Sequence, residues 1–328
     1  MIPLSIADIA EITGGSLDCV SDPDQRVTGF IEFDSRKVTK GGLFLALPGA
    51  RVDGHDYAEK AIEQGAVAVL AARPVGVPAV VVKPQGRVTG DAANADIYAH
   101  DEDGSAAAVV QALSDIAREV TRRLTAEQGL DIVGVTGSAG KTSTKDLLAT
   151  IFRAEGDTVA PPGSFNNEVG LPYTALRCDE HTRFLVAEMS ARGIGHIRHL
   201  TTITAPTVGV VLNVGTAHLG EFGSRENIAQ AKGELVEALP SAAEGGVAVA
   251  LALGLGLVNG GVGASLAHAD WVVAQVAPLT GATAVQSKAY AQGMRLYFNE
   301  VNKSGGVHGD RLRLVSADDR GSPEETVK

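Results

Sequence analysis

A glycine-rich segment between an apolar run and an amphipathic run constrains the fold of this chain most strongly. The run Asp131–Gly137, DIVGVTG, predicts a buried strand, and the next residues, SAGKTSTKDLLATIFRAEG, predict a helix. We expect one side of that helix to carry Leu147, Leu148, Ile151 and Phe152. A strand that turns into a helix through glycines suits phosphate binding, because backbone amides and the helix N-terminus face the anion.

We expect this loop to bind a nucleoside triphosphate. Lys141 would reach the β- and γ-phosphates, and the Thr142 hydroxyl would hold magnesium. Val135 stands where the general pattern G-x-x-x-x-G-K-[ST] has its first glycine, so the match to that pattern is incomplete. The expected nucleotide-binding residues are Gly137, Ser138, Ala139, Gly140, Lys141, Thr142 and Ser143.

Polar residues also follow the next two apolar strands. Glu188 comes directly after Phe184–Ala187, so its carboxylate is expected at the same sheet edge as the loop. A lone acid there is more often a solvated strand end, but beside a phosphate loop it is a candidate metal anchor. His218, in NVGTAHLGEFGS, is a candidate to bind a second magnesium or orient a phosphate oxygen, although a lone histidine is more often a surface or capping group.

Two further polar positions are weaker candidates. Lys232 falls on a predicted helix that begins near Arg225, where a lysine is usually solvated. The loop Asp34–Lys37 follows a predicted strand and brings together hydroxyl and cationic donors. Such donors suit a diphosphate, but the loop taken alone is weak evidence.

Alternating strands and helices predict an α/β protein with a parallel sheet covered on its faces. A small N-terminal α/β domain (1–104) precedes a central phosphate-loop ATPase domain (105–249), an apolar junction (250–269) and a strand-helix-strand segment (270–328). We expect the following elements: helix Ile6–Thr13, strand Val27–Glu32, helix Tyr57–Gln64, strand Ala66–Ala71, loop Gln85–Gly104 and helix Ser105–Glu127.

Charge and composition exclude several classes of protein. The net charge of -11 and the lack of a long basic run leave a nucleic-acid partner without electrostatic support. Cys19 and Cys178 lack metal-ligand spacing, which favours reduced thiols in a cytosolic protein. The uncharged stretch LALGLGLVNGGVGASLAHA looks like a secretory signal, but it is internal and too rich in glycine for a membrane span. We expect a cytoplasmic monomer without stable membrane insertion.

Several motifs, in this order, resemble the Mur ligase family: T-G-S-A-G-K-T-S, S-F-N-N-E-V-G-L-P, A-E-M-S, N-V-G-T-A-H-L-G-E-F-G-S and A-K-G-E. The runs F-D-S-R-K-V, G-G-L-F-L-A-L-P-G and D-G-H-D-Y resemble the uridine-nucleotide domain of the same family. The element F-N-N-x-x-G-x-P at Phe165–Pro172 resembles the corresponding motif of the family member that adds a dipeptide, and it differs from the members that add a single amino acid. The likeness covers about residues 1–249.

The resemblance implies an ATP-dependent ligase of peptidoglycan synthesis that uses Mg2+. ATP would phosphorylate the terminal carboxylate of UDP-MurNAc-tripeptide, and the amine of D-alanyl-D-alanine would attack the acyl phosphate to form an amide. Carried over by motif, Lys141 and Thr142 bind phosphates and metal, and Glu188 and His218 bind Mg2+. The other matched positions are Lys232 for the lysine carbamylated in this family, Asn166 and Asn167 for the muramoyl peptide, and Ser35 and Arg36 for the UDP part.

The resemblance ends near Val249. From about residue 251 the chain resembles the start of a periplasmic branched-chain amino-acid binding protein, in V-A-Q-V-A-P-L-T-G, Y-F-N-E-V-N-K-S-G-G-V-H-G and L-V-S-A-D-D. A junction of two gene fragments explains this change most simply. Without the family's C-terminal domain we expect a marginally stable ATPase half and very low turnover. A nonenzymatic nucleotide-binding or amino-acid-binding fusion protein, or an exported receptor cleaved after Ala269, stays open as an alternative.

Overall fold

The chain forms two compact units in the computed structural model. The residues described are 1–49, 52–84, 86, 98, 101–215, 219–240, 247–250, 271–277 and 311–318, with 288, 292 and most positions between 295 and 306. The first unit comprises Met1–Asp131, Phe152–Leu185 and Thr202–Thr204. The second comprises Ile132–Ile151, Val186–Thr201 and Ala205–Lys328. The domain limits expected after residues 104, 249 and 269 stay predictions.

The first unit is built on a five-stranded sheet with the order β2-β7-β6-β5-β4. Strands β4 to β7 pair in parallel, and β2 runs antiparallel to β7. The strands are β2 (Ser16–Asp18), β4 (Ile31–Glu32), β5 (Gly42–Leu45), β6 (Ala66–Ala71) and β7 (Ala79–Val81). The apolar residues of β5 and most of those in β6 and β7 are buried, as expected of a parallel sheet, whereas Leu17 in the antiparallel β2 is 41% exposed.

The single strand predicted at Val27–Glu32 is wrong, because this segment holds two short strands. β3 (Arg26–Val27) pairs antiparallel with β1 (Leu4–Ser5), whereas β4 joins the five-stranded sheet. Between them the backbone at Gly29 passes close to Gly42, whose nitrogen would lie 2.7 Å from a β carbon at position 29. The amides of Thr28 and Gly29 both donate to the Gly41 carbonyl (3.0 and 2.9 Å), so the regular strand pairing is interrupted here.

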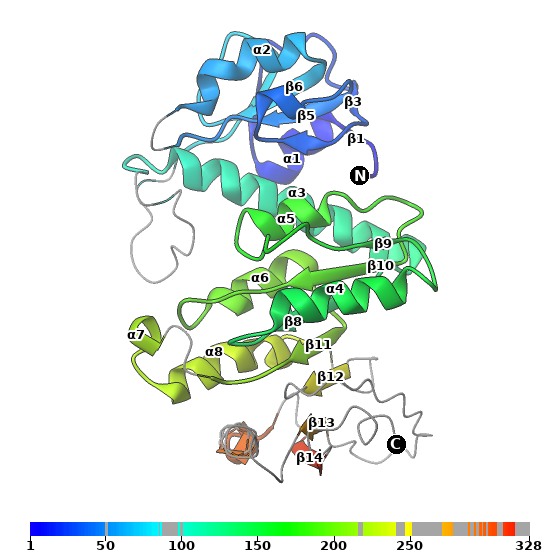
Figure 1. Cartoon of the computed structure of the whole chain (residues 1–328). Helices are drawn as coiled ribbons and strands as arrows, with labels where there is room; N and C mark the ends of the chain where they lie inside the picture. The colour runs from blue at the N-terminus through cyan, green and yellow to red at the C-terminus, as the bar shows by residue number, and fades with distance from the viewer. Residues whose placement is uncertain are drawn as a thin grey trace. The chain divides into compact units, whose positions relative to one another are not determined.

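Helices cover both faces of the first sheet. Figure 1 shows α2 (Ala58–Glu63) on one side of β5 and β6, and α1 (Ile6–Thr13) on the other. α1 begins with a capping box, in which the Ser5 hydroxyl accepts from the Asp8 amide (3.0 Å) and Asp8 accepts from the Ser5 amide (2.9 Å). Two short 3-10 helices, η1 (Ser35–Lys37) and η2 (Gly54–Tyr57), complete this part of the chain.

The long helix α3 (Ser105–Gln128) packs against α1 and against α5 (Gly170–Ala175). Asp101 fixes its start, because the two carboxylate oxygens accept from the amides of Ala106 (3.0 Å) and Ala107 (2.9 Å). Gly129 ends the helix in a left-handed conformation. The predicted helix at Ser105–Glu127 is therefore confirmed to within one residue.

A second five-stranded sheet has the order β12-β11-β8-β10-β9. β11 pairs in parallel with β8 and β12, and β9 pairs in parallel with β10. The strands are β8 (Asp131–Thr136), β9 (Thr158–Val159), β10 (Phe184–Glu188), β11 (Val208–Val211) and β12 (Val247–Ala250). Helices alternate with these strands along the chain, so the predicted α/β fold class is confirmed.

The helices that follow these strands are α4 (Lys141–Phe152), α6 (His196–Thr204), α7 (Leu219–Phe222) and α8 (Arg225–Glu237). The apolar side predicted for α4 is partly wrong: Leu148 is buried, but Leu147 and Ile151 are 48% and 40% exposed. The buried stripe instead runs through Lys145, Leu148 and Ala149, at helical spacing.

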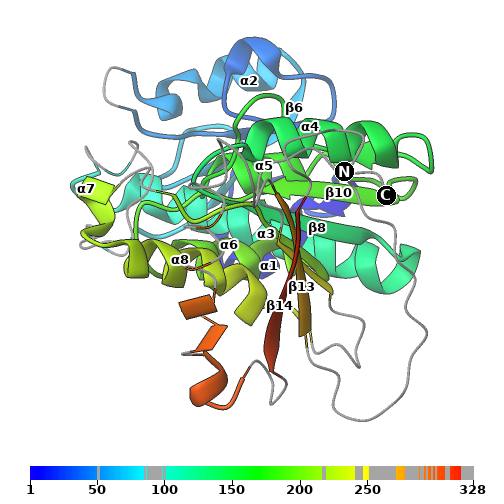
Figure 2. The ribbon, with the colours of Figure 1, turned by 60° about the horizontal axis from the view of Figure 1, so that its bottom comes forward.

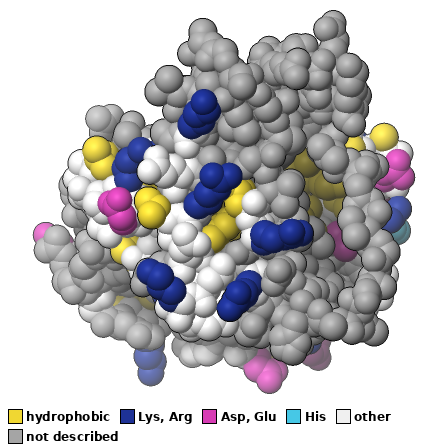
Figure 3. Space-filling view, turned by 90° about the horizontal axis from the view of Figure 1, so that it is seen from below, with side chains coloured by type: hydrophobic (Ala, Val, Ile, Leu, Met, Phe, Trp, Pro, Cys, Tyr) yellow, Lys and Arg dark blue, Asp and Glu magenta, His cyan; other side chains and the backbone are white. Residues whose placement is uncertain are grey.

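The C-terminal segment contains two parallel strands, β13 (Trp271–Ala277) and β14 (Leu312–Asp318), which Figure 2 shows side by side. Helical residues lie between them at the described positions 288, 292, 295–296, 298–299 and 301–303, so the segment has the expected strand-helix-strand order. Figure 3 views the molecule from below and shows Lys and Arg side chains gathered on the described part of that face. Among the described residues no helix is long and apolar enough to cross a membrane.

Candidate functional site

The glycine-rich loop joins the end of β8 to the start of α4 in the second unit. Gly140 adopts a φ of 84°, a left-handed conformation that a side chain disfavours, and α4 begins at the next residue. The first helical bond from this turn runs from the Thr144 amide to the Gly140 carbonyl (3.0 Å). The amides of Lys141, Thr142 and Ser143 precede it, so they have no partner within the helix.

Asn213 holds the first part of the loop. Its backbone carbonyl accepts from the Ser138 amide (3.1 Å), and its side chain both accepts from the Ala139 amide (3.0 Å) and donates to the Ala139 carbonyl (2.9 Å). The Ser138 hydroxyl in turn accepts from the Gly215 amide (3.0 Å). Two loop amides are therefore already bonded, and the phosphate-facing donors are those at the start of α4.

Glu188 lies beside the loop, at the end of β10 and next to β8 in the sheet order. Its carboxyl group is buried, and one oxygen lies 3.4 Å from the Thr142 hydroxyl. The Lys141 ammonium donates to the Gly137 carbonyl (2.8 Å). Burial lowers the pKa of Lys141, while the nearby Glu188 charge raises it in part. A cation, a hydroxyl and a carboxylate thus converge at the helix start.

Lys232 is buried in α8, with only 3% of its surface exposed. Burial, and to a smaller extent the Lys141 charge, lower the pKa of its amine to about 7, while Glu234 acts in the opposite direction. The Lys232 nitrogen lies 5.7 Å from the centre of the Phe222 ring. The solvated lysine that is usual on a helix is therefore not the arrangement found, and this amine is largely neutral near pH 8.

Glu234 links α8 to the start of α6 through hydrogen bonds. Its carboxylate accepts from the amides of Gly195 (2.5 Å) and Arg198 (3.0 Å) at the start of α6. A buried carboxylate bonded in this way ties the two helices together through a charge-assisted helix cap. Lys232 lies two residues before Glu234, so the same contact fixes the backbone that carries the amine.

His218 lies outside the described residues, so the structure assigns it no position. Within the described part of the chain, no three His, Cys, Asp or Glu side chains group into a metal site. Thr142 and Glu188 are the oxygen donors that the structure brings together, and oxygen ligands are those that Mg2+ prefers. The residues present therefore fit a magnesium ion held jointly with phosphate oxygens.

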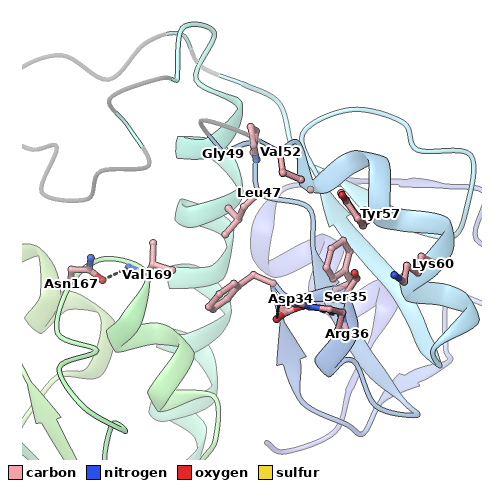
Figure 4. Close-up of a pocket in the computed structure, with 14 residues that line it drawn as sticks. Asp34, Ser35, Arg36, Leu47, Gly49, Val52, Tyr57, Lys60, Asn167 and Val169 are labelled. Carbon is pink, nitrogen blue, oxygen red and sulfur yellow. Dashed lines mark hydrogen bonds and ion pairs between the residues drawn. The ribbon is translucent and has the colours of Figure 1, made fainter.

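The first unit contains a cavity of about 820 Å³ (Figure 4). Such a volume suits a nucleotide-sized ligand. Its lining includes apolar and aromatic side chains that are well exposed, and exposed apolar groups around a cavity mark a ligand surface. The lining residues used below are Phe33, Asp34, Ser35, Arg36, Val52, Tyr57, Lys60, Asn167 and Val169.

Three of the predicted substrate-binding residues line this cavity. Ser35 and Arg36 lie on η1, and Asn167 lies in the segment before α5. The Asn167 side-chain oxygen accepts from the amides of Val169 (3.3 Å) and Gly170 (2.9 Å), which leaves its amide group to donate elsewhere. Asn166 does not belong to the cavity lining.

Gly170 explains the spacing of the F-N-N-x-x-G element. A β carbon at this position would lie 2.7 Å from the backbone of Phe165, so only glycine allows the turn to close. The Phe165 ring then stacks on Tyr173, with ring centres 5.6 Å apart. The local sequence therefore shapes the wall on which Asn167 and Val169 stand.

A buried polar cluster holds the two walls of the cavity together. Glu32 at the end of β4 accepts from the Tyr173 hydroxyl (3.0 and 3.1 Å) and from Arg177 (2.7 Å). The Arg177 guanidinium lies 4.4 Å from the Phe30 ring centre and 4.7 Å from that of Tyr173. Phe33, in the cavity lining, also contacts the Tyr173 ring at 5.3 Å.

The sequence interpretation missed several of these residues. Asn213 opens the motif NVGTAHLGEFGS, and its place directly after an apolar strand was the available signal. Tyr57 ends the run D-G-H-D-Y, whereas Lys60 lies on the predicted helix after that run without a motif of its own, so the sequence did not single out Lys60. Tyr173 and Glu32 are separated by 141 positions, and only the folded chain joins them.

Comparison with known proteins identifies the family of the segment that carries this site. The Mur ligase family, catalytic domain, matches residues 28–123, and the Mur ligase middle domain matches residues 135–252. Over residues 28–252 the chain therefore belongs to the Mur ligase family. Residues 271–328 match a different family, described as periplasmic binding protein, in agreement with the change of character predicted near residue 250.

Two similar relatives, from different bacteria, carry the same name. The UDP-N-acetylmuramoyl-tripeptide--D-alanyl-D-alanine ligase of Mycobacterium tuberculosis is 57% identical over 243 residues, covering 73% of this chain and 47% of the relative. The ligase of the same name from Escherichia coli is 33% identical over 251 residues, covering 76% and 48%. The chain thus spans about half the length of the relatives it matches.

Solved structures of proteins with the short name MurF also resemble this chain. A crystal structure of MurF from Acinetobacter baumannii superposes with a TM-score of 0.61 and 29% identity, covering 76% of this chain and 49% of that one. MurF ligase from Thermotoga maritima in complex with ADP superposes with a TM-score of 0.54 and 33% identity, covering 69% and 46%.

Proposed function

We propose that residues 1–249 form the nucleotide-binding and substrate-binding part of an ATP-dependent amide ligase of peptidoglycan synthesis, acting in the cytoplasm. The ligase joins D-alanyl-D-alanine to UDP-MurNAc-tripeptide. The observation that carries the proposal is the convergence of Lys141, Thr142 and Glu188 at the start of α4. The names of the relatives support the choice of substrates.

ATP binds at the start of α4 in this proposal. The amides of Lys141, Thr142 and Ser143 donate to phosphate oxygens, and the Lys141 ammonium exchanges the Gly137 carbonyl for a phosphate. Gly137, Ser138, Ala139 and Gly140 shape the loop, with Ser138 and Ala139 held by Asn213. The MurF relative in complex with ADP supports this assignment.

Thr142 and Glu188 hold Mg2+, with His218 as a further ligand. Magnesium supplies positive charge that offsets the negative charge accumulating on the phosphates. The carboxylate of the tripeptide attacks the γ-phosphorus of ATP and releases ADP. The amine of D-alanyl-D-alanine then attacks the acyl carbon and releases phosphate, so one amide forms for each ATP split.

Lys232 is carbamylated in this proposal. A neutral amine attacks carbon dioxide, whereas an ammonium does not, so a pKa of about 7 keeps the amine reactive at physiological pH. The amine nitrogen bonds to the carbon of carbon dioxide and releases a proton, and the product is a buried carbamate anion that can pair with the Lys141 cation. Burial of Lys232 therefore serves the modification.

The cavity of the first unit binds the UDP-MurNAc part. Ser35 and Arg36 contact the UDP, and Asn166 and Asn167 contact the muramoyl peptide. The exposed Phe33, Val52 and Tyr57 side chains give a flat base an apolar surface, and the charged side chains lie beside them. A monomer is proposed as the acting species.

Release of phosphate from ATP tests the proposal. The chain is incubated with Mg2+, ATP and UDP-MurNAc-tripeptide, with and without D-alanyl-D-alanine, and hydroxylamine is added to trap an acyl phosphate as a hydroxamate. We expect hydroxamate that depends on the tripeptide and is lost in Lys141→Ala, while Lys83→Ala, an exposed lysine, behaves as the unsubstituted chain. Mg2+-dependent ATP binding without any tripeptide-dependent product would favour the nonenzymatic alternative.

A further inference from the structure

The cavity of the first unit contains three charged side chains, and their balance decides what it can bind. Asp34 directly precedes η1, Arg36 lies on η1, and Lys60 lies on α2. The remaining lining residues are apolar, aromatic or neutral polar groups. The charge available to a bound phosphate therefore depends on how these three side chains pair.

Arg36 is already paired. Its Nε and one terminal nitrogen each lie 2.9 Å from an oxygen of Asp34, and its backbone amide donates to the same carboxylate (3.1 Å). This two-pronged arrangement holds the carboxylate ionised, and the pKa of Asp34 falls to about 2. The charges of Asp34 and Arg36 therefore cancel locally, and the pair adds no net charge to the cavity.

Among the described residues, the positive charge of Lys60, unlike that of Arg36, is not balanced by a neighbouring carboxylate. In the part of the chain that the structure describes, no carboxylate lies within ion-pair distance of its ammonium. Figure 4 shows its side chain leaving α2 toward Ser35 and Arg36. The buried Ala58 and Ala61 fix α2 against the sheet, so the backbone of Lys60 is held in place while its charge faces the cavity.

We propose that Lys60, rather than Arg36, makes this cavity select a ligand that carries a diphosphate. The inference rests on the proposed function, since it concerns the same UDP-binding cavity. Lys60 supplies the net positive charge of the lining, and a diphosphate placed beside η1 lies between this ammonium and the Ser35 hydroxyl. The apolar side chains bind the base and do not distinguish uridine from UDP.

Calorimetric titration of the full chain with uridine, UMP and UDP tests this assignment. These probes share one base and sugar and differ in phosphate number. We expect Lys60→Ala to weaken UDP binding about tenfold, as loss of one charge-assisted contact does, and to change uridine binding less than twofold. Lys60→Arg, which keeps the charge, should restore most of the UDP affinity.

Two variants separate Lys60 from its neighbour. The double variant Asp34→Asn/Arg36→Gln removes both partners of the ion pair and leaves the net charge of the lining unchanged, so it should weaken UDP binding less than Lys60→Ala does. Asp34→Asn keeps the side-chain oxygen that accepts from the Arg36 amide but frees the guanidinium, so it should strengthen UDP binding. The effects of Lys60→Ala and Asp34→Asn on UDP binding should shrink at high salt, because the Lys60 and Arg36 cations are exposed.

Each outcome is informative. Equal loss of uridine and UDP in Lys60→Ala, or unchanged UDP binding, overturns the role of Lys60 while the proposed nucleotide cavity stands. A larger loss of UDP binding in Asp34→Asn/Arg36→Gln than in Lys60→Ala reverses the assignment. Failure of the unsubstituted chain to bind uridine or UDP at all overturns the proposed cavity itself and the inference with it.

Discussion

Removing the Tyr173 hydroxyl tests whether the buried cluster around Glu32 stabilises the first unit. Tyr173→Phe keeps the ring and its contacts with Phe33 and Phe165 but removes a donor to the Glu32 carboxylate. Glu32 is only 5% exposed, so water cannot readily replace the lost donor. Arg177 still bonds to the carboxylate, so the cluster is weakened rather than abolished.

The magnitude follows from the charge of the acceptor. A hydrogen bond to a charged group contributes about 1.5–3 kcal/mol, and with Arg177 still in place we expect a loss of about 2 kcal/mol. The folding equilibrium constant would then fall roughly 30-fold, since about 1.4 kcal/mol corresponds to tenfold. With a urea m-value of about 2 kcal/mol/M, the unfolding midpoint should fall by roughly 1 M.

Urea denaturation followed by circular dichroism measures this loss. Tyr57→Phe is the matched control, since Tyr57 is an exposed residue of the same unit. The variant pair Glu32→Gln and Tyr173→Phe, made singly and together, gives the coupling energy between the two side chains. A loss below about 0.5 kcal/mol, or one equal to that of the control, would refute the argument that this cluster stabilises the fold.

Three more predictions concern single positions. Lys232→Met should raise the free energy of unfolding below pH 7, and this gain should shrink as the pH rises from 7 toward 10.5. Between these values the lysine of the unfolded chain still binds a proton, whereas the folded one, with a pKa of about 7, does not. A difference in urea midpoint between the two chains that stays constant across this range would contradict the prediction. Gly140→Ala should lower the free energy of unfolding by about 1–2 kcal/mol, because alanine disfavours the left-handed φ at this position. Urea denaturation with Ala139→Gly as the comparison measures this loss, and an unchanged stability would argue against that backbone conformation. Asp101→Ala should lower the free energy of unfolding by about 1–2 kcal/mol, because it removes the acceptor for two amides at the start of α3, whereas Glu102→Ala should leave it unchanged. Faster amide hydrogen exchange at Ala106 and Ala107 would show that the helix start opens.

The sequence by itself determined the elements whose signals are local. Helix Ile6–Thr13 and strand Ala66–Ala71 have the predicted bounds, and the strand, loop and helix around Gly140 follow one another as expected. Capping residues, glycines and the spacing of apolar side chains act over a few positions, so they can be recognised without the fold. The ordered motifs also indicated the family and the change near residue 250.

Only the tertiary structure decided which polar groups pair. The sequence showed neither that Asn213 bonds to loop amides more than seventy positions away, nor that Glu32 meets Tyr173. It also did not show that Leu147 and Ile151 face outward. These outcomes depend on close approach between distant segments, because a buried donor or acceptor is bonded by whatever group the fold brings near it. The local sequence does not encode that approach, and the charge that Lys60 presents to the cavity follows from it.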